Sequence, residues 1–318
     1  MAPSFAEMPA ILAEEKTQGL QLLFKTGTKL LDTAKVFVCG DNGIGKTSLI
    51  KTLDTGRHLD AHEQPPDEPD KPDERTAGIR LSQLSLSHTH ENGEGEGQDA
   101  TLRVFDFGGQ PEFHVMHTLL VSDWTAAFVV CVDLSKSNEE LRQSLWYWLQ
   151  FIATRVKQSR ETLFASELQD HDAIDKRPRV ILVGTKADKC HKSHKLNTKD
   201  GGSKRLRACL RKVASTFGSV LNIVKSENFI ALNCFRRRDS GFEALCQQLH
   251  DHAAAIKNLN LVVPGIVSKV LAALETVRKE AALPMSVDEA LARARAVHSD
   301  LSAMDSALTL ELFRITLK

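Results

Sequence analysis

Residues 40–47 have the types and spacing needed to bind phosphate. They read Gly-Asp-Asn-Gly-Ile-Gly-Lys-Thr and fit the pattern G-x-x-x-x-G-K-[ST] in full. The glycines let backbone N–H groups curl around phosphate oxygens, and the helix-like run that follows adds its positive N-terminal end. Lys46 can reach terminal phosphates, and the Thr47 hydroxyl can ligate Mg²⁺. The predicted contacts to a nucleoside phosphate are Asp41, Asn42, Gly43, Ile44, Gly45, Lys46, Thr47 and Ser48.

A second segment suited to phosphate chemistry follows the apolar run 102–105. Asp106, at the end of this run, can hold a Mg²⁺-bound water, and Gly109 can give its N–H to a γ-phosphate. Gln110 is then placed to orient an attacking water. An Asp-Gly turn is common in any protein. Its position one strand after a phosphate loop favours a role in nucleotide hydrolysis.

Two further segments predict which base is bound. Thr185, Lys186 and Asp188 follow the apolar run 180–183. An Asp carboxylate can accept hydrogen bonds from guanine N1–H and N2–H₂, a donor pair that adenine lacks, and the Lys stem can lie along the base. The alternative is a Lys-Asp turn on the surface without a binding role. An ATPase is disfavoured because this motif suits guanine. A weaker signal comes from Asn233 and Cys234, where a backbone N–H, that of Cys234, can meet the guanine O6.

These segments need a framework of alternating strands and helices to bring them together. Strand-like runs lie at 36–39, 79–86, 102–105, 126–132, 180–183 and 229–232. Helix-like runs lie at 48–53, 137–157, 204–217 and 240–257, and residues 137–140 form a capping box. The alternation predicts an α/β fold with a doubly wound, mostly parallel six-stranded sheet and one antiparallel edge strand.

The remaining segments are expected to lie outside this sheet. Residues 5–32 read as helix, and 57–75 read as a mobile loop because prolines alternate with acidic residues. Two helical runs, 264–282 and 286–303, look like the start of a further helical module. The expected organisation is an N-terminal helical segment (1–33), a central domain (34–257) and a partial helical domain (258–318).

Composition narrows the class of protein. The 318 residues include 41 basic and 41 acidic side chains, so nothing suggests bulk attraction to nucleic acid or to an acidic membrane. No apolar run approaches the roughly 18 residues that a transmembrane helix needs. Six scattered cysteines are typical of a reducing compartment, which predicts a cytoplasmic protein.

Taken together, the motifs resemble those of the Ras-like small GTPases, in the same order. Finer details resemble the Roc (Ras of complex proteins) domain of the Roco family. These are the proline-rich loop before Thr76, the Phe-Gly-Gly-Gln-Pro-Glu-Phe run at 107–113, and Thr185 opening the guanine motif. The resemblance covers about 35–257, and the tail from about Leu261 resembles the start of COR, the dimerising module after Roc.

This resemblance implies a guanine-nucleotide switch that hydrolyses GTP slowly, binds GTP/GDP and Mg²⁺, and belongs to a larger Roco-type signalling protein that forms a homodimer through COR. It implies that Thr76 contacts Mg²⁺ and the γ-phosphate. Thr47, Thr76 and Asp106 are then the metal ligands, and Lys46, Thr76 and Gln110 the catalytic residues. A nucleotide-binding regulatory or dimerisation scaffold with negligible turnover is the alternative.

Two departures from the small GTPases carry expectations of their own. Thr185 stands where they usually have Asn, so the brace between base loop and phosphate loop is expected to be lost and the nucleotide held lightly. Asn233 and Cys234 stand where a Ser-Ala pair is usual. In the helix 137–157, Trp148 is expected in the core and Trp146 on the outside as a contact for a neighbouring domain.

Overall fold

The structure is a computed structural model of the chain. It describes residues 28–30, 33–55, 79–86, 100–109, 125–163, 177–190, 204–224, 230–235, 240–259, 262–264, 292–293 and 296. The chain divides into two compact units. One unit runs from Asp32 to Leu259, and the other combines Met1–Leu31 with Asn260–Lys318.

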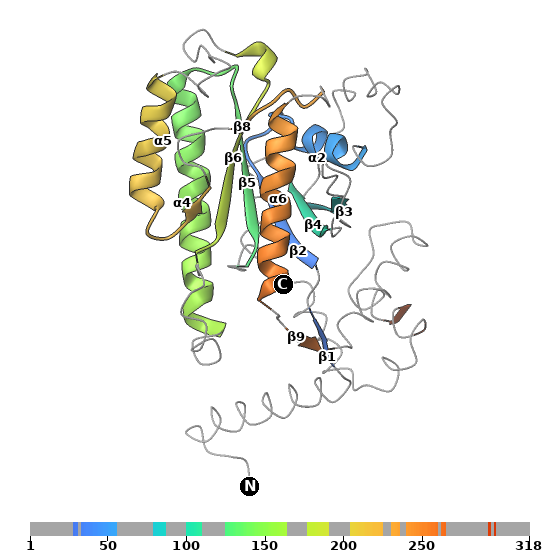
Figure 1. Cartoon of the computed structure of the whole chain (residues 1–318). Coiled ribbons are helices and arrows are strands. Elements are labelled where there is room, and N and C mark those ends of the chain that lie inside the picture. Colours follow the sequence, from blue (N-terminus) through green and yellow to red (C-terminus); the bar gives the residue numbers. More distant parts are fainter. Residues whose placement is uncertain are drawn as a thin grey trace, which may run out of the picture. The chain divides into compact units, whose positions relative to one another are not determined.

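The unit Asp32–Leu259 is built on a mostly parallel sheet (Figure 1). Its strands are β2 (Thr33–Cys39), β3 (Ile79–Leu86), β4 (Ala100–Phe107), β5 (Ala127–Asp133), β6 (Arg179–Thr185), β7 (Asn222–Ile223) and β8 (Ile230–Ala231). Their order is β3-β4-β2-β5-β6-β7, and β8 also pairs with β6. Among these described strands, β3 alone is antiparallel to its neighbour. The expected place of one last strand is thus shared by β8 and by β7, which sequence reasoning missed.

Helices cover both faces of this sheet, as a doubly wound fold requires (Figure 1). On one face α4 (Asn138–Leu163) packs on β5 and on α5 (Lys204–Phe217). On the other, α2 (Lys46–Thr55) contacts β3 and β4, and α6 (Ser240–Asn258) contacts β2, β4 and β8. The short 3₁₀ helix η2 (Ala187–Lys189) follows β6. The expected fold class is confirmed.

Helix α4 begins at the predicted capping box. The Ser137 hydroxyl and backbone N–H both donate to Glu140 Oε2, at 2.8 and 3.0 Å, and the Glu140 N–H lies 3.4 Å from Ser137 Oγ. The helix continues to Leu163, past its expected end at 157, and buries Trp148 as expected. Trp146 corrects an expectation. It is partly buried, and its ring packs on Phe217 of α5 with centroids 5.2 Å apart.

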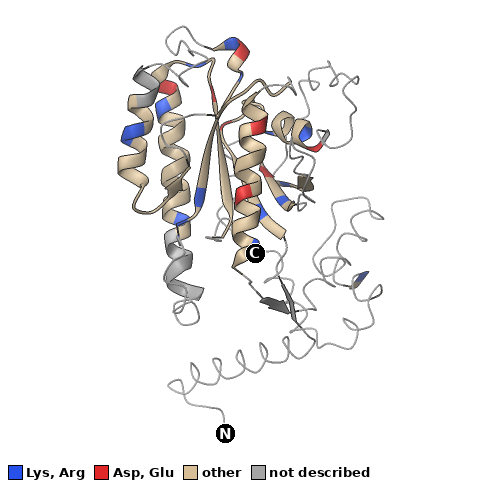
Figure 2. Cartoon of the chain, in the orientation of Figure 1, with Lys and Arg blue, Asp and Glu red and all other residues tan. Residues whose placement is uncertain are grey.

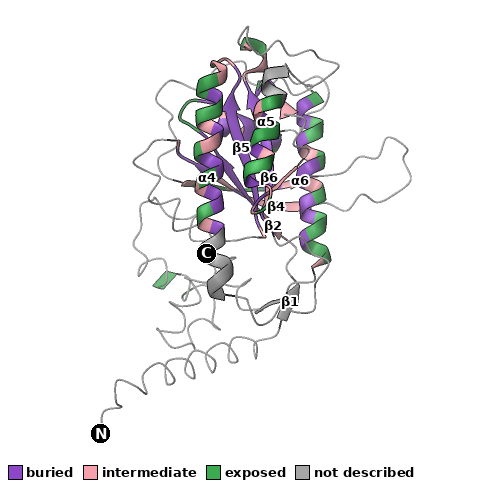
Figure 3. Cartoon of the chain, turned by 90° about the vertical axis from the view of Figure 1, so that its left-hand side faces the viewer, coloured by how far each residue is buried: buried purple, intermediate pink, exposed green. Residues whose placement is uncertain are grey.

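The core lies in the middle of the sheet. Phe37 of β2 is 1% exposed. The centroid of its ring lies 4.9, 5.4 and 5.2 Å from the ring centroids of Phe105, Phe107 and Phe128. In β5 and β6 the charged residues, Asp133 and Arg179, lie at strand ends (Figure 2). The purple strands of Figure 3 are covered by helices with exposed outer faces. A rigid apolar platform therefore carries the loops at the strand ends.

The unit formed by Met1–Leu31 and Asn260–Lys318 has one described strand pair. In it, β1 (Thr28–Leu30) runs antiparallel to β9 (Val262–Pro264). The expectation of helix through residue 32, and from Pro264 onward, is wrong at these positions, because distant segments supply each other's hydrogen-bond partners. Ala292, Arg293 and Ala296 are helical, inside the expected helix 286–303. Most of the expected segments 5–32, 57–75 and 264–282 lie outside the described residues.

The described residues were also searched for membrane-spanning helices and for disulfides. A search of their helices finds none that combines the length and apolarity needed to cross a bilayer. The six cysteines all lie among the described residues and are free thiols.

Candidate functional site

The predicted motifs meet at the carboxyl end of the parallel strands. Strand β2 lies between β4 and β5, so the loop after β2 leaves the sheet where the strand order reverses. In α/β sheets this is the usual place for a ligand. Strand register pairs Val38 with Asp106, and Asp133 with Thr185. The pairing brings the phosphate loop, the Asp106 segment and the base motif to one edge.

The phosphate loop has the backbone that its glycines allow. Gly40, Gly43 and Gly45 have φ of 146°, 69° and 96°, a region that other residues rarely adopt. A Cβ at Gly40 would lie 2.6 Å from the backbone oxygen of Cys131. Helix α2 then starts at Lys46, two residues before the expected 48, so the loop opens directly onto a helix N-terminus.

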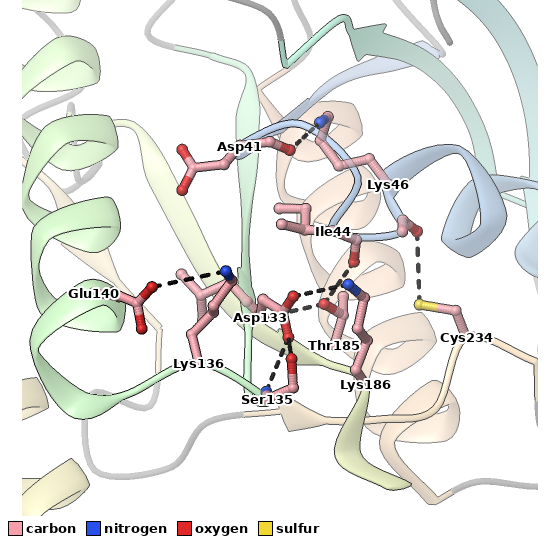
Figure 4. Close-up of polar contacts among 12 residues, drawn as sticks. Asp41, Ile44, Lys46, Asp133, Ser135, Lys136, Glu140, Thr185, Lys186 and Cys234 are labelled. Carbon is pink, nitrogen blue, oxygen red and sulfur yellow. Dashed lines mark hydrogen bonds and ion pairs between the residues drawn. The ribbon is translucent and has the colours of Figure 1, made fainter. Parts of the chain in front are cut away.

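Lys46 lies folded within this loop. The side chain is 6% exposed, and its Nζ donates to the backbone oxygens of Gly40 at 2.9 Å and Asp41 at 2.8 Å (Figure 4). Burial lowers the pKa of Lys46, and the nearby Asp106 carboxylate opposes that effect. The loop therefore holds a desolvated ammonium group that a phosphate would stabilise.

The oxygen atoms of Thr47 and Asp106 fit a divalent cation. Thr47 Oγ1 donates to Asp106 Oδ2 at 2.6 Å, and Asp106 is 1% exposed. Mg²⁺ prefers hard oxygen ligands and usually takes only one or two from protein, with the rest from phosphate and water. No cluster of three or more His, Cys, Asp or Glu suited to a metal occurs among the described residues.

Gly109 touches the phosphate loop directly. A Cβ built on it would lie 2.5 Å from Asn42 N and from Asp41 C, so the two backbones leave no room for a larger residue. Predicted contact residue Gly109 is thus beside the loop. Gln110 and Thr76, predicted as catalytic residues, lie outside the described residues.

Thr185 braces the base motif to the phosphate loop, which corrects the expectation that this brace is lost. Its side chain is buried, and Oγ1 donates to the Ile44 backbone oxygen at 2.7 Å and lies 3.1 Å from the Val132 oxygen (Figure 4). The end of β6 comes close enough to the loop for a short hydroxyl to reach it. The structure therefore gives no reason to expect a loose site at this position.

Lys186 and Asp133 form an ion pair that sequence reasoning missed. The Lys186 backbone is in the left-handed region, with φ 55°. Its Nζ lies 2.8 Å from Asp133 Oδ2 (Figure 4). Burial opposes ionisation of Asp133, but hydrogen bonds from Lys186 and Ser135 outweigh burial and lower its pKa. An acidic residue that ends an apolar strand was the available signal. Asp188 lies in η2 and is exposed.

The segment after β8 closes the site from another side. Cys234 Sγ lies 3.6 Å from the Gly45 backbone oxygen, and the Cys234 oxygen accepts from Thr52 Oγ1 at 2.6 Å. Asn233 Oδ1 accepts from the Phe235 backbone N–H at 3.0 Å, so this oxygen shapes its own turn. Cys234 is thereby held against both the phosphate loop and α2.

A cavity of about 620 Å³ lies beside the phosphate loop. Its walls come from the loop itself, the ends of β5 and β6, and the start of α4. The lining residues are Asp41, Asn42, Gly43, Ile44, Asp133, Lys136, Glu140, Leu141, Gln143, Ser144, Tyr147 and Lys186.

Comparison with known proteins agrees with the motifs. Residues 35–170 match the family described as Ras of Complex, Roc, domain of DAPkinase. This segment belongs to the Roc family. The chain is also similar to a probable serine/threonine-protein kinase, pats1, of Dictyostelium discoideum, with 29% identity over 145 residues. That alignment covers 43% of this chain and 4% of the kinase. The chain thus spans a small part of this relative's length.

Two further similarities concern a GTP-binding protein and a solved structure. The septum-promoting GTP-binding protein 1 of Schizosaccharomyces pombe is 25% identical over 173 residues, which cover 52% of this chain and 78% of that protein. A structure of Methanosarcina barkeri Roco2 RocCORdC bound to GDP aligns with a TM-score of 0.50 and 18% identity. It covers 91% of this chain and 68% of that one, and at this identity it supports the fold.

Proposed function

We propose that the Roc unit binds guanine nucleotide and acts as a molecular switch that hydrolyses GTP slowly to GDP and phosphate. The observation that carries the proposal is the direct bonding of three loops. The hydroxyl of Thr47 donates to Asp106, and that of Thr185 donates to the Ile44 oxygen. Phosphate, metal and base motifs are thus joined in one site, as a nucleotide requires.

The phosphate end of the site would use residues 41–48. Backbone N–H groups of the loop and the α2 N-terminus suit phosphate oxygens, and Lys46 needs only to leave two backbone oxygens to reach them. Thr47 and Asp106 would hold Mg²⁺, joined by Thr76. When bound, Mg²⁺ neutralises charge on the phosphate oxygens.

For hydrolysis we assign roles that follow the motifs. Gln110 would orient the attacking water, Gly109 would sense the γ-phosphate, and Lys46 would stabilise the charge that develops on the phosphates. We expect Gln110→Leu to lower single-turnover phosphate release while leaving GDP affinity within about twofold. Unchanged phosphate release in this variant would remove Gln110 from the mechanism.

Specificity for guanine would come from Asp188, with Lys186, Thr185 and the Asn233–Cys234 segment around the base. Asp188→Asn offers a test, because an amide presents a donor where the carboxylate presents an acceptor. Xanthine carries an oxygen at C2 where guanine carries an amino group. We therefore expect Asp188→Asn to lose GDP affinity and gain xanthosine diphosphate affinity. A variant that still prefers GDP would show that Asp188 does not read the base.

We further propose that the chain combines a helical segment (1–33), the Roc GTPase domain (34–257) and the start of a COR-like domain (258–318), within a larger cytoplasmic Roco-type signalling protein. The likeness to a Roco2 RocCORdC structure and to a short part of a long kinase supports this organisation. Homodimerisation through COR is part of the same proposal. No nucleic-acid partner is expected.

The alternative is a nucleotide-binding scaffold with negligible turnover. Two measurements distinguish the functions. Displacement of a fluorescent guanine nucleotide by GTP but not by ATP supports the guanine site, and preference for ATP would contradict it. Single-turnover phosphate release from bound GTP then supports the enzyme, whereas zero release would favour the scaffold.

A further inference from the structure

The phosphate loop of this chain contains an acidic side chain. Asp41 is the second residue of the loop, directly before the backbone that would surround the phosphates. A carboxylate free to turn toward polyphosphate would repel it, since like charges a few ångströms apart are strongly unfavourable in a partly desolvated site. The geometry of Asp41 therefore matters for any phosphate ligand.

The backbone oxygen and the carboxylate of Asp41 have different partners in the structure. Its backbone oxygen accepts from Lys46 Nζ at 2.8 Å, whereas its carboxylate points away from Lys46 (Figure 4). That carboxylate accepts from the indole Nε1–H of Trp148 at 2.9 Å. Trp148 is 1% exposed and belongs to α4, so the packing of that helix holds its ring.

A neighbour of Trp148 supports this placement. Tyr147 lines the cavity beside the loop together with Asp41, and burial and the Asp41 carboxylate both raise the pKa of Tyr147. The negative charge of Asp41 thus lies on the α4 side of the loop. Gly109 packs against the backbone of Asp41 from its own segment, which leaves the residue little freedom.

We propose that Trp148 is a positioning residue that clamps the Asp41 carboxylate against α4 and keeps its charge away from the phosphates. The inference rests on the proposed nucleotide site. Its ligand chemistry is the polyphosphate, irrespective of the base. The same contact fixes the Asp41 backbone oxygen that accepts from Lys46 Nζ. Helix α4 thereby helps to set the conformation of the phosphate loop.

The test compares four proteins for binding of inorganic pyrophosphate by calorimetry and of fluorescent GDP by titration. They are the wild type, Trp148→Phe, the control Trp146→Phe, and the double variant Asp41→Asn/Trp148→Phe. Trp148→Phe keeps a buried ring but removes the N–H donor. The control changes Trp146, two residues earlier in the same helix, which packs on Phe217 of α5.

We expect Trp148→Phe to weaken both ligands about tenfold, the size of one hydrogen bond to a charged group. The control should stay within about twofold of the wild type. Adding Asp41→Asn should recover most of the loss, because an unclamped amide does not repel phosphate. Raising the salt concentration should also shrink the defect of Trp148→Phe, since salt screens the repulsion.

Two outcomes would overturn the clamp. One is a Trp148→Phe protein that binds both ligands as the wild type does. The other is a double variant as weak as the single one, which would mean that lost packing explains the defect. A wild type that binds pyrophosphate but no GDP would contradict the proposed function and leave the clamp to be judged on pyrophosphate.

A pair of changes at exposed Asp41 decides the matter if Trp148→Phe does not fold. Asp41→Glu keeps the charge on a longer side chain that does not fit the same indole contact, whereas Asp41→Asn removes the charge. We expect the Glu variant to bind pyrophosphate about tenfold more weakly than the Asn variant. Equal affinities would overturn the proposal.

Discussion

At the scale of single residues, Thr185 links the base motif to the phosphate loop. One buried hydroxyl connects the end of β6 to the phosphate loop through the Ile44 oxygen. A buried carbonyl that loses its donor costs about 1–3 kcal/mol. A residue without a donor at this position would leave the Ile44 oxygen without this hydrogen bond.

We expect Thr185→Val to lower the free energy of unfolding by about 1–3 kcal/mol and to speed GDP dissociation, because the methyl group cannot donate to Ile44. Urea unfolding and fluorescent GDP release measure the two effects. Thr185→Ser, which keeps the hydroxyl, is the matched control and should dissociate GDP more slowly than Thr185→Val. Equal rates for the two variants would contradict the role of the hydroxyl.

A pH dependence is expected from Asp133. Its pKa in the folded protein is lowered from 3.8, so the unfolded chain takes up this proton at a higher pH than the folded one. The contribution to stability is therefore present above pH 3.8 and lost as pH falls through the folded pKa. Asp133→Asn should flatten the decline of urea midpoints as the pH falls below 3.8. An equally steep decline in this variant would show that other carboxylates cause it.

At the scale of elements, the N-terminus of α6 shows close packing overriding helix propensity. Gly241 is the second residue of the helix, and a Cβ there would lie 2.4 Å from the Ala231 backbone oxygen in β8. Alanine is favoured over glycine in helices by about 1 kcal/mol. Here the helix would have to move away from the strand that leads to Cys234.

We expect Gly241→Ala to destabilise the protein by about 1–3 kcal/mol, since overpacking outweighs propensity. Thermal unfolding measures the change, and GDP release should quicken because β8 leads into the base segment. A stabilised variant would mean that α6 adjusts without strain. The capping residue Ser137 offers an independent comparison on α4, where Ser137→Ala should cost about 1 kcal/mol through loss of the cap alone.

At the scale of the whole molecule, the unit Asp32–Leu259 contains every described site residue and a complete sheet with helices on both faces. We expect a fragment of residues 32–259 to fold cooperatively and to bind GDP as the 318-residue chain does. GDP at a hundred times its Kd should stabilise the fragment by about 2.7 kcal/mol. The melting temperature should therefore rise with GDP concentration. A fragment that unfolds without a cooperative transition would show that the other unit is required.

How much was predictable follows from the range of the interactions involved. The phosphate loop, the capping box of α4 and the helix 204–217 depend on neighbours in sequence, and they appear where expected. The strand β1, the ion pair of Asp133 with Lys186 and the packing of Trp146 depend on partners far along the chain. Periodicity contains no information about such partners.

For this protein the sequence by itself determined the family, the fold class and the order of the motifs, because glycine spacing, charge placement and apolar runs are local properties. The tertiary structure alone decided that Thr185 still braces the loop and that Trp148 holds Asp41. Each of those contacts joins residues more than a hundred positions apart, at 2.7 and 2.9 Å. Such contacts form only when the sheet register brings their strands and helices together, and a hydrogen bond is lost within an ångström.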